Sequence, residues 1–419
     1  MAISDLRRRF LAGALLIAAL FTVIQAVDYR QNVPSNDTYQ YAKQTLRFLG
    51  DSPSTAVHDS VVMYCQDSGN AAVTADSLDN ATNPSHSTYT SAYQGCLQTY
   101  RNGLTPSSPR YLAIFTSRPG YPLLAAPIAA VFGLRFGLWA AAMLCTLLSG
   151  FLVLLLLRSF GCSRLVALGG EALLLVAPTG YWGSRMLTDG PSLTTVLLTL
   201  MGAVWLVQHR RTRSGLWLLC AGFATGFVIR YSSEQLVALL LTLAALVCLW
   251  RVPSSRHRDM KLLALVSGAG FVVSEALSTL LGWPGFSASL QDTFTKHFAR
   301  PDVPDPVSKL VRLDIHYWGY FPVSEPTALL LAAGLVTLAV LLIRRDRVYG
   351  ILVVALSLTG LGAVVAHPIA SQSDRLMMPV WLLLVLGLPR LVHGGPASAP
   401  ADDPPTPTQA RPVVAAEAA

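Results

Sequence analysis

Apolar runs of about 16 to 22 residues recur along this chain, and each is long enough to cross a hydrocarbon core of ~30 Å as a helix. In lipid, a helix satisfies all of its own backbone hydrogen bonds. Hydrophobic residues make up 53% of the chain and charged residues 13%, which is unusual for a soluble domain. The sequence therefore predicts an all-α, polytopic transmembrane bundle with spans at 10–27, 136–157, 165–183, 191–208, 214–229, 234–250, 262–283, 326–343, 349–366 and 376–393.

The formal net charge of +8 does not indicate a nucleic-acid partner, because the basic residues cluster in short loops on one side of the predicted bundle. With both termini in the cytoplasm, these loops satisfy the positive-inside rule. We therefore expect a plasma-membrane protein with a transmembrane module over 1–393, extracytoplasmic loops at 28–135 and 284–325, and a disordered cytoplasmic tail at 394–419. The cytoplasmic basic residues are Arg7, Arg8, Arg9, Arg158, Arg164, Arg210, Arg211, Arg213, Arg251, Arg256, Arg258, Lys261, Arg344, Arg345, Arg347, Arg390 and Arg411.

The first outer loop contains two further structural signals. Cys65 and Cys96 lie where disulfides are permitted, so we expect them to pair, with two free thiols as the alternative. The apolar run at 119–133 is too short to span a bilayer and contains Pro127, which favours a helix lying along the outer interface. The first helix itself is expected to remain uncleaved, because no small-residue cleavage site stands out after Gln25, with a removed signal peptide as the alternative.

Two carboxylates are the candidate catalytic groups. Asp37, with Tyr39 and Tyr41 nearby, follows the first helix at the outer face. Asp189 precedes Pro191 at the outer turn between the third and fourth helices, where an acid is costly unless it meets water, a cation or a polar cavity. Helix capping is the alternative role for Asp189. Partial shielding is expected to raise the pKa of Asp37 toward the range of a general base.

Basic and aromatic residues on the same face predict a site for a phosphate and a sugar ring. An interfacial aromatic belt explains part of this pattern equally well, and Arg230 has pairing with Glu234 as its alternative. Among the intramembrane acids, Glu275 is the better placed to face a cavity. The candidate substrate-binding residues, besides the two tyrosines, are Arg118, Arg230, Lys296, Arg300, His316, Tyr317 and Arg375.

The sequence contains no motif for nucleotide binding or zinc binding. No P-loop, GxGxxG, HExxH or GxSxG pattern stands in the required context, and His297 and His316 have no ligand spacing around them. No metal site and no cofactor are therefore assigned, although a divalent cation bound by acids such as Asp67 or Asp76 stays open. The candidate reactive groups all lie outside, where nucleotide sugars are not made, so a lipid-phosphate-linked sugar is the expected donor.

The order of these features resembles the GT-C superfamily of polytopic glycosyltransferases that use polyprenyl-phosphate sugars, the group that includes protein O-mannosyltransferases and lipid A aminoarabinose transferases. The resemblance covers residues 1 to about 390. Two departures are that Asp37 has no acidic neighbour and that no soluble domain follows the last helix. The matching residues are Asp37, Tyr39, Tyr41 and Ala42; Tyr121 to Gly133; Asp189 and Pro191; Gly222, Gly226 and Arg230; and Asp374-Arg375 before Leu-Met-Met-Pro.

This resemblance implies inverting sugar transfer at the extracytoplasmic face, to a glycan, lipid or protein acceptor, within membrane lipid. Asp37 would deprotonate the acceptor hydroxyl, Asp189 would position the acceptor or stabilise positive charge on the ring, and cations would meet the departing phosphate. A transporter or flippase for a lipid-linked sugar is the alternative, although no internal repeat appears. A non-catalytic protein of GT-C shape is the other.

Overall fold

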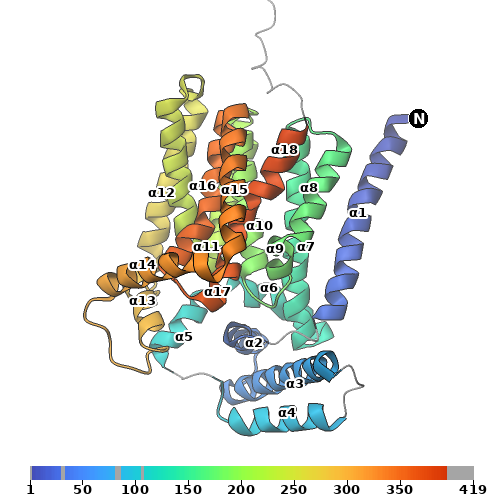
Figure 1. Ribbon diagram of the computed structural model, residues 1–419, viewed down its shortest axis with the longest axis vertical. Helices are drawn as coiled ribbons and strands as arrows, with labels where there is room; N and C mark the ends of the chain where they lie inside the picture. Colours follow the sequence, from blue (N-terminus) through green and yellow to red (C-terminus); the bar gives the residue numbers. More distant parts are fainter. Residues whose placement is uncertain (1, 30–33, 81–85, 105–107, 394–419) are drawn as a thin grey trace, which may run out of the picture.

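The computed structural model describes residues 2–29, 34–80, 86–104 and 108–393, and every element in these ranges is helical (Figure 1). The tail predicted at 394–419 lies outside the described residues. The α-helices are α1 (Ala2–Asp28), α2 (Asn36–Phe48), α3 (Pro53–Asn80), α4 (His86–Thr99), α5 (Pro109–Thr116), α6 (Gly120–Phe132), α7 (Leu134–Ser159), α8 (Arg164–Val176), α9 (Pro178–Gly183), α10 (Asp189–Val207), α11 (Thr212–Arg251), α12 (Arg258–Leu280), α13 (Phe286–Phe294), α14 (Pro306–Ser324), α15 (Pro326–Arg345), α16 (Arg347–Ala366), α17 (Ala370–Leu376) and α18 (Leu388–Val392), with 3-10 turns at η1 (Pro253–Ser255) and η2 (Met378–Trp381) and a π-helical turn at η3 (Leu383–Gly387).

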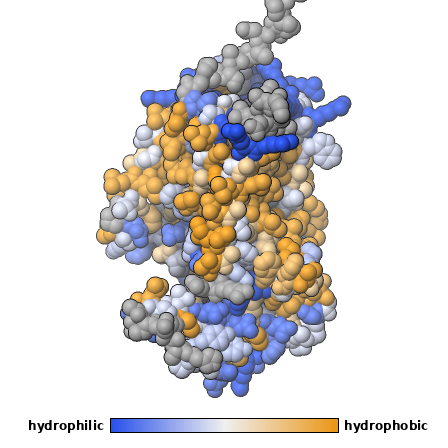
Figure 2. All heavy atoms as spheres, turned by 90° about the vertical axis from the view of Figure 1, so that its right-hand side faces the viewer, coloured by the Kyte–Doolittle hydropathy of each residue, from blue (hydrophilic) through white to orange (hydrophobic). Residues whose placement is uncertain are grey.

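Eight helical segments in the described ranges are long and apolar enough to cross a membrane: Arg8–Asp28, Leu134–Ser159, Asp189–Val207, Thr212–Arg251, Arg258–Leu280, Thr327–Arg345, Arg347–Ala366 and Ala370–Val392. Figure 2 shows an apolar band between two hydrophilic ends on the face it presents. The chain is therefore a helical membrane protein, as predicted. The apolar run at 119–133 forms the short helix α6, which lacks the length of a span.

Three of the predicted spans differ from the observed helices. Residues 165–183 form α8 and α9 instead of one helix, because the helix ends at Ala177 and restarts at Pro178, whose ring has no N–H to continue the ladder. The predicted spans 214–229 and 234–250 form the single 40-residue helix α11, interrupted only at Arg230, where φ is −161° and ψ is 79°. Because of these two differences, eight helical segments in the described ranges, and not ten, have the length and composition of a span.

Helix α11 folds back on itself at Arg230 and forms a tight hairpin. A Cβ added at Gly226 would lie 1.9 Å from Oε2 of Glu234, although eight residues of straight helix would separate them by about 12 Å. At the far end, the hydroxyl of Thr212 donates to Asp259 of α12 at 3.3 Å, so the beginning of α11 lies beside the helix that follows it. The two halves therefore cross the bundle in opposite directions, which agrees with the two predicted spans.

The bundle has two distinct ends. At the first, which we call the basic end, side chains from separate helix ends meet: Gln208 donates to Asp346 at 2.9 Å, and Arg390 lies 3.7 Å from the same carboxylate. The short loops at this end carry arginines, including Arg210 and Arg258. The opposite end, which we call the loop end, carries α2–α5, α13 and α14 (Figure 1). The charge asymmetry between the ends is the one that the sequence predicts.

At the loop end, α3 and α4 lie side by side as a layer beyond the bundle, and α2 lies between that layer and α6 (Figure 1). The predicted disulfide between Cys65 and Cys96 joins α3 to α4. Around it pack Tyr39 of α2 and Val61 of α3, which form a small core separate from that of the bundle. The disulfide therefore stabilises the layer against which α2 rests.

Replacing both cysteines, in the variant Cys65→Ser/Cys96→Ser, is expected to lower the free energy of unfolding of this layer by about 3 kcal/mol. The reason is that the disulfide closes a chain segment of 31 residues and limits the unfolded ensemble. Limited proteolysis of the purified protein would measure the loss as faster cleavage within α3 and α4. Cys220→Ser, at an exposed free cysteine, is the control and should leave the cleavage rate unchanged.

Candidate active site

Asp37 is fixed in the first turn of α2 by a capping box. The hydroxyl of Ser35 accepts a hydrogen bond from the backbone N–H of Thr38 at 3.2 Å, and the hydroxyl of Thr38 accepts one from the backbone N–H of Ser35 at 3.4 Å. An acid in the first turn is also favoured by the helix dipole. The next turn of α2 buries Tyr41, whose ring packs edge-on against Tyr121 with centroids 5.3 Å apart. This packing sets the position of the Asp37 carboxylate.

Arg375 joins the two candidate carboxylates. It lies in the last turn of α17, where its Nη1 is 2.9 Å from Oδ2 of Asp37 and its Nε donates to Oδ2 of Asp189 at 2.8 Å. The cap of α10 is Thr188, and its side chain makes no capping hydrogen bond, so capping does not account for Asp189. The two acids that the sequence singled out therefore share one arginine.

Two more arginines complete the cluster. Nη1 of Arg230 lies 3.7 Å from Oδ1 of Asp189, so Arg230 pairs with this acid and not with Glu234. Arg118 follows α5 and donates to the hydroxyl of Tyr41. In the described part of the chain, the Nε atoms of Arg118 and Arg230 are buried without a hydrogen-bond partner. Three guanidinium groups thus face two carboxylates, which leaves positive charge and spare donors for an anion.

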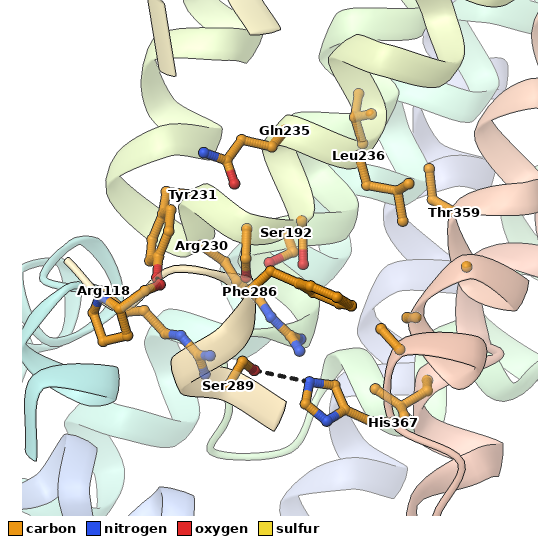
Figure 3. Close-up of a pocket in the computed structure, with 18 of the residues that line it drawn as sticks. Arg118, Ser192, Arg230, Tyr231, Gln235, Leu236, Phe286, Ser289, Thr359 and His367 are labelled. Carbon is orange, nitrogen blue, oxygen red and sulfur yellow. Dashed lines mark hydrogen bonds between the residues drawn. The ribbon is translucent and has the colours of Figure 1, made fainter. Parts of the chain in front are cut away.

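A cavity of about 490 Å³ opens beside this cluster, within the roughly 300–1,000 Å³ typical of small-molecule sites. Figure 3 shows Arg118 and Arg230 extending toward the same part of it. Asp189, Arg375 and Glu275 also line it, whereas Asp37 lies behind Arg375 and outside the lining. The rest of the wall is largely apolar, with Leu193, Val196, Leu236, Val365 and Met378 among its residues. The cavity thus has a cationic wall that continues into an apolar one.

His367 connects α13 to the bundle at the cavity wall. Its Nε2 lies 3.2 Å from the hydroxyl of Ser289, and its Nδ1 lies 3.0 Å from the hydroxyl of Thr293, both on α13 (Figure 3). Burial lowers the pKa of His367 to about 4, and the positive charges of Arg230 and Arg118 add to this effect. The imidazole is therefore neutral at physiological pH, with one ring nitrogen donating and the other accepting.

Replacing His367 with alanine is expected to loosen α13. The two lost hydrogen bonds contribute on the order of 1 kcal/mol each, so backbone amides of 286–294 should exchange with deuterium at least about tenfold faster. Hydrogen exchange followed by mass spectrometry measures this directly. His316→Ala is the control, because His316 is exposed on α14 and its ring contacts that of Tyr320 on the same helix. Unchanged exchange in α13 would contradict the assigned role.

The pKa of Asp37 moves in the opposite direction to the expectation from the sequence. Burial raises it, but the guanidinium groups of Arg375 and Arg118 outweigh burial and hold the pKa of Asp37 below its usual range. The difference arises because the position of Asp37 in the sequence predicts its partial shielding, whereas the arginines that lower its pKa come from distant segments of the chain. Asp37 is therefore an ionised carboxylate at neutral pH, able to accept a proton.

Several predicted binding residues lie away from the cavity lining. Tyr39 packs in the small core around the disulfide, and Lys296 and Arg300 are exposed beyond the end of α13. His316 and Tyr317 lie on α14, where their rings contact Tyr320 and Phe321. Tyr41 contacts the cluster through Arg118 and through Thr188, whose hydroxyl lies 3.5 Å from its own. The structure thus brings together Asp37, Asp189, Tyr41, Arg118, Arg230 and Arg375.

The cavity also contains residues to which the sequence gave no role. Ser289 and Tyr231 line it, and Trp283, which also lines it, stacks on Phe227 with ring centroids 4.9 Å apart. Neutral hydroxyl and imidazole groups carry no charge pattern, so spacing gave no signal for them. Within the described ranges, no three His, Cys, Asp or Glu side chains gather as a metal site.

Comparison with known proteins adds no relative to this picture. No family model, curated protein or solved structure matches the chain. The geometry of the cavity and its charges therefore carries the functional argument.

Proposed function

We propose that this protein is an integral membrane glycosyltransferase that transfers a sugar from a polyprenyl-phosphate donor to an acceptor hydroxyl at the extracytoplasmic face. The observation that carries the proposal is the arrangement of Asp37 and Asp189 around Arg375, beside a cavity that offers the buried, unpartnered Nε donors of Arg118 and Arg230. A lipid phosphate needs such a cationic wall next to an apolar one. Placing the loop end outside follows from the positive-inside rule.

In the proposed reaction, Asp37 accepts the proton of the acceptor hydroxyl while the acceptor oxygen forms a bond to the anomeric carbon. The bond from that carbon to the phosphate oxygen breaks, and the phosphate leaves with the electron pair. Arg118 and Arg230 stabilise the leaving phosphate. A single displacement of this kind inverts the anomeric configuration.

The positions of the two acids suggest where each substrate lies. Asp189 lines the cavity, whereas Asp37 lies on the other side of Arg375 next to α2. The donor therefore occupies the cavity, and the acceptor approaches from the side of α2. Arg375 is already engaged by two carboxylates, so it acts mainly as the residue that positions them.

The proposal is tested by a transfer assay with the purified protein in lipid vesicles, using a panel of polyprenyl-phosphate sugars and acceptor alcohols. We expect one donor to be consumed and its sugar to appear on the acceptor with inverted configuration. Arg230→Gln should lower transfer about tenfold to a hundredfold, because a charge-assisted hydrogen bond to the phosphate is lost. Arg300→Gln is the control, since Arg300 lies outside the cavity.

Two outcomes would contradict transferase activity. If the donor crosses the vesicle membrane without losing its sugar, the protein is a carrier of the lipid-linked sugar. If it binds in the cavity and is neither moved nor consumed, the protein is a binding protein that shares only the architecture.

A further inference from the structure

An apolar groove of about 610 Å³ runs along the outside of the bundle, between α15 and the η3–α18 segment, and shares no lining residue with the cavity of the candidate active site. Leu330, Gly334 and Leu341 form one wall, and Leu388 and Leu391 form the other. The only polar side chain in the lining is Thr337, and its hydroxyl already donates to the carbonyl of Ala333 at 2.8 Å. The side chains that line the groove therefore offer no free hydrogen-bond donor to a ligand inside it.

The length and position of the groove match one lipid chain. From Leu330 to Leu341 the helical rise of 1.5 Å per residue gives about 17 Å, close to half of the ~30 Å hydrocarbon core. One end of the groove, at Leu341 and Leu391, lies toward the basic end of the bundle. An acyl chain in the groove would thus have its headgroup at that end.

Two arginine side chains lie at this end of the groove. Arg344 is exposed and lies three residues after Leu341, so it continues the same face of α15. Arg347 is also exposed. The neighbouring acid, Asp346, is already paired with Arg390 at 3.7 Å, and its carboxylate also accepts from Gln208. Among the described residues, neither arginine has an acidic partner within 4 Å.

We propose that the groove between α15 and α18 is a binding site for an anionic phospholipid, with an acyl chain against Gly334 and the phosphate headgroup at Arg344. Basic residues at the cytoplasmic end of an intramembrane groove are the arrangement that recognises acidic headgroups. A second copy of the chain fits less well. A symmetric pair in one membrane would bring two copies of Arg344 together at the same depth, and like charges repel.

Native mass spectrometry of the purified full chain, with equal amounts of phosphatidylglycerol and phosphatidylcholine added, tests this site. We expect the protein to retain phosphatidylglycerol at least about fivefold over phosphatidylcholine, the ratio that corresponds to ~1 kcal/mol per arginine near the lipid surface. Arg344→Gln should remove most of this preference. Gly334→Leu should reduce retention of both lipids about threefold by filling the groove. A Cβ at Gly334 meets no atom within 4 Å, so this variant should still fold.

Two matched controls separate the site from general effects. Arg213→Gln removes an exposed arginine at the basic end on α11, and Ala332→Leu adds the same side chain to an exposed position of α15 outside the groove. Neither should change lipid retention. Equal retention of the two lipids by the unaltered chain, or an Arg213→Gln effect as large as that of Arg344→Gln, would overturn the proposal. A dimer that Gly334→Leu dissociates would overturn it in favour of a second copy. None of these outcomes depends on transferase activity.

Discussion

Replacing Asp37 with asparagine is expected to lower the rate of sugar transfer by at least about 10²-fold, the lower part of the range for general-base catalysis. The lower part applies because Arg375 and Arg118 depress the pKa of Asp37, which makes the carboxylate a weaker base than one tuned to neutral pH. Asparagine keeps the size of the side chain and an oxygen that accepts from Arg375. The measurement is the initial rate of transfer by the purified variant in vesicles.

The pH dependence of the unaltered protein gives a second readout for Asp37. A carboxyl group whose folded pKa is depressed contributes stability above its unfolded pKa of 3.8 and loses it as the pH falls through the folded value. We therefore expect Asp37 to stay ionised throughout the neutral pH range. The rate of sugar transfer should show no loss there that is due to protonation of Asp37. Asp76→Asn, in α3, is the control for the Asp37→Asn variant and should leave the rate of transfer unchanged. Full transfer activity in the Asp37→Asn variant would show that another residue is the base.

Replacing Arg375 with leucine is expected to destabilise the protein by about 3–5 kcal/mol, because removing one partner of a buried ion pair leaves its counter-charges unpaired. The side chain of Arg375 is 10% exposed and that of Asp189 only 5%, so little water reaches them. Thermal unfolding of the detergent-solubilised protein would show the loss as a lower midpoint. Transfer activity should fall as well, since both carboxylates lose their position.

A double-mutant cycle tests whether Arg375 stabilises the protein by compensating the charge of Asp189 or by some other contact. If Arg375 acts by compensating Asp189, then adding Asp189→Asn to Arg375→Leu should restore part of the stability, because the unpaired buried charge is removed. Arg300→Leu is the matched control, as it deletes an exposed arginine at the same end and should change the midpoint little. If the stability losses of the two substitutions are additive, Arg375 does not act by compensating Asp189.

The transmembrane architecture was predictable from the sequence because hydropathy is a local property. The prediction of separate, continuous spans was wrong at two places, and at each a single residue determines where the helix ends or turns. Pro178 ends what looks like one apolar run, and the extended backbone of Arg230 reverses the chain without a loop. Local patterns do not reveal how abruptly a helix turns.

The candidate site was predictable only in part. Asp189 was identified by the cost of an acid at its depth, and Asp37 by its position with two tyrosines after the first helix. Their shared contact with Arg375 depends on how α2, α10 and α17 pack. Interleaved basic and aromatic residues pointed to Lys296 and Arg300, which the fold leaves at the surface beyond α13. His367 and Ser289 carry no such pattern and were not assigned a role, although they line the cavity.

The reversal of α11 at Arg230 has a mechanical consequence. Since one extended residue connects the two antiparallel halves and Gly226 packs directly against Glu234, no slack exists to absorb a tilt of either half. Helices adjust their tilt when the thickness of the surrounding bilayer changes. A tilt of either half would therefore move the backbone of Arg230, whose guanidinium lies 3.7 Å from Asp189.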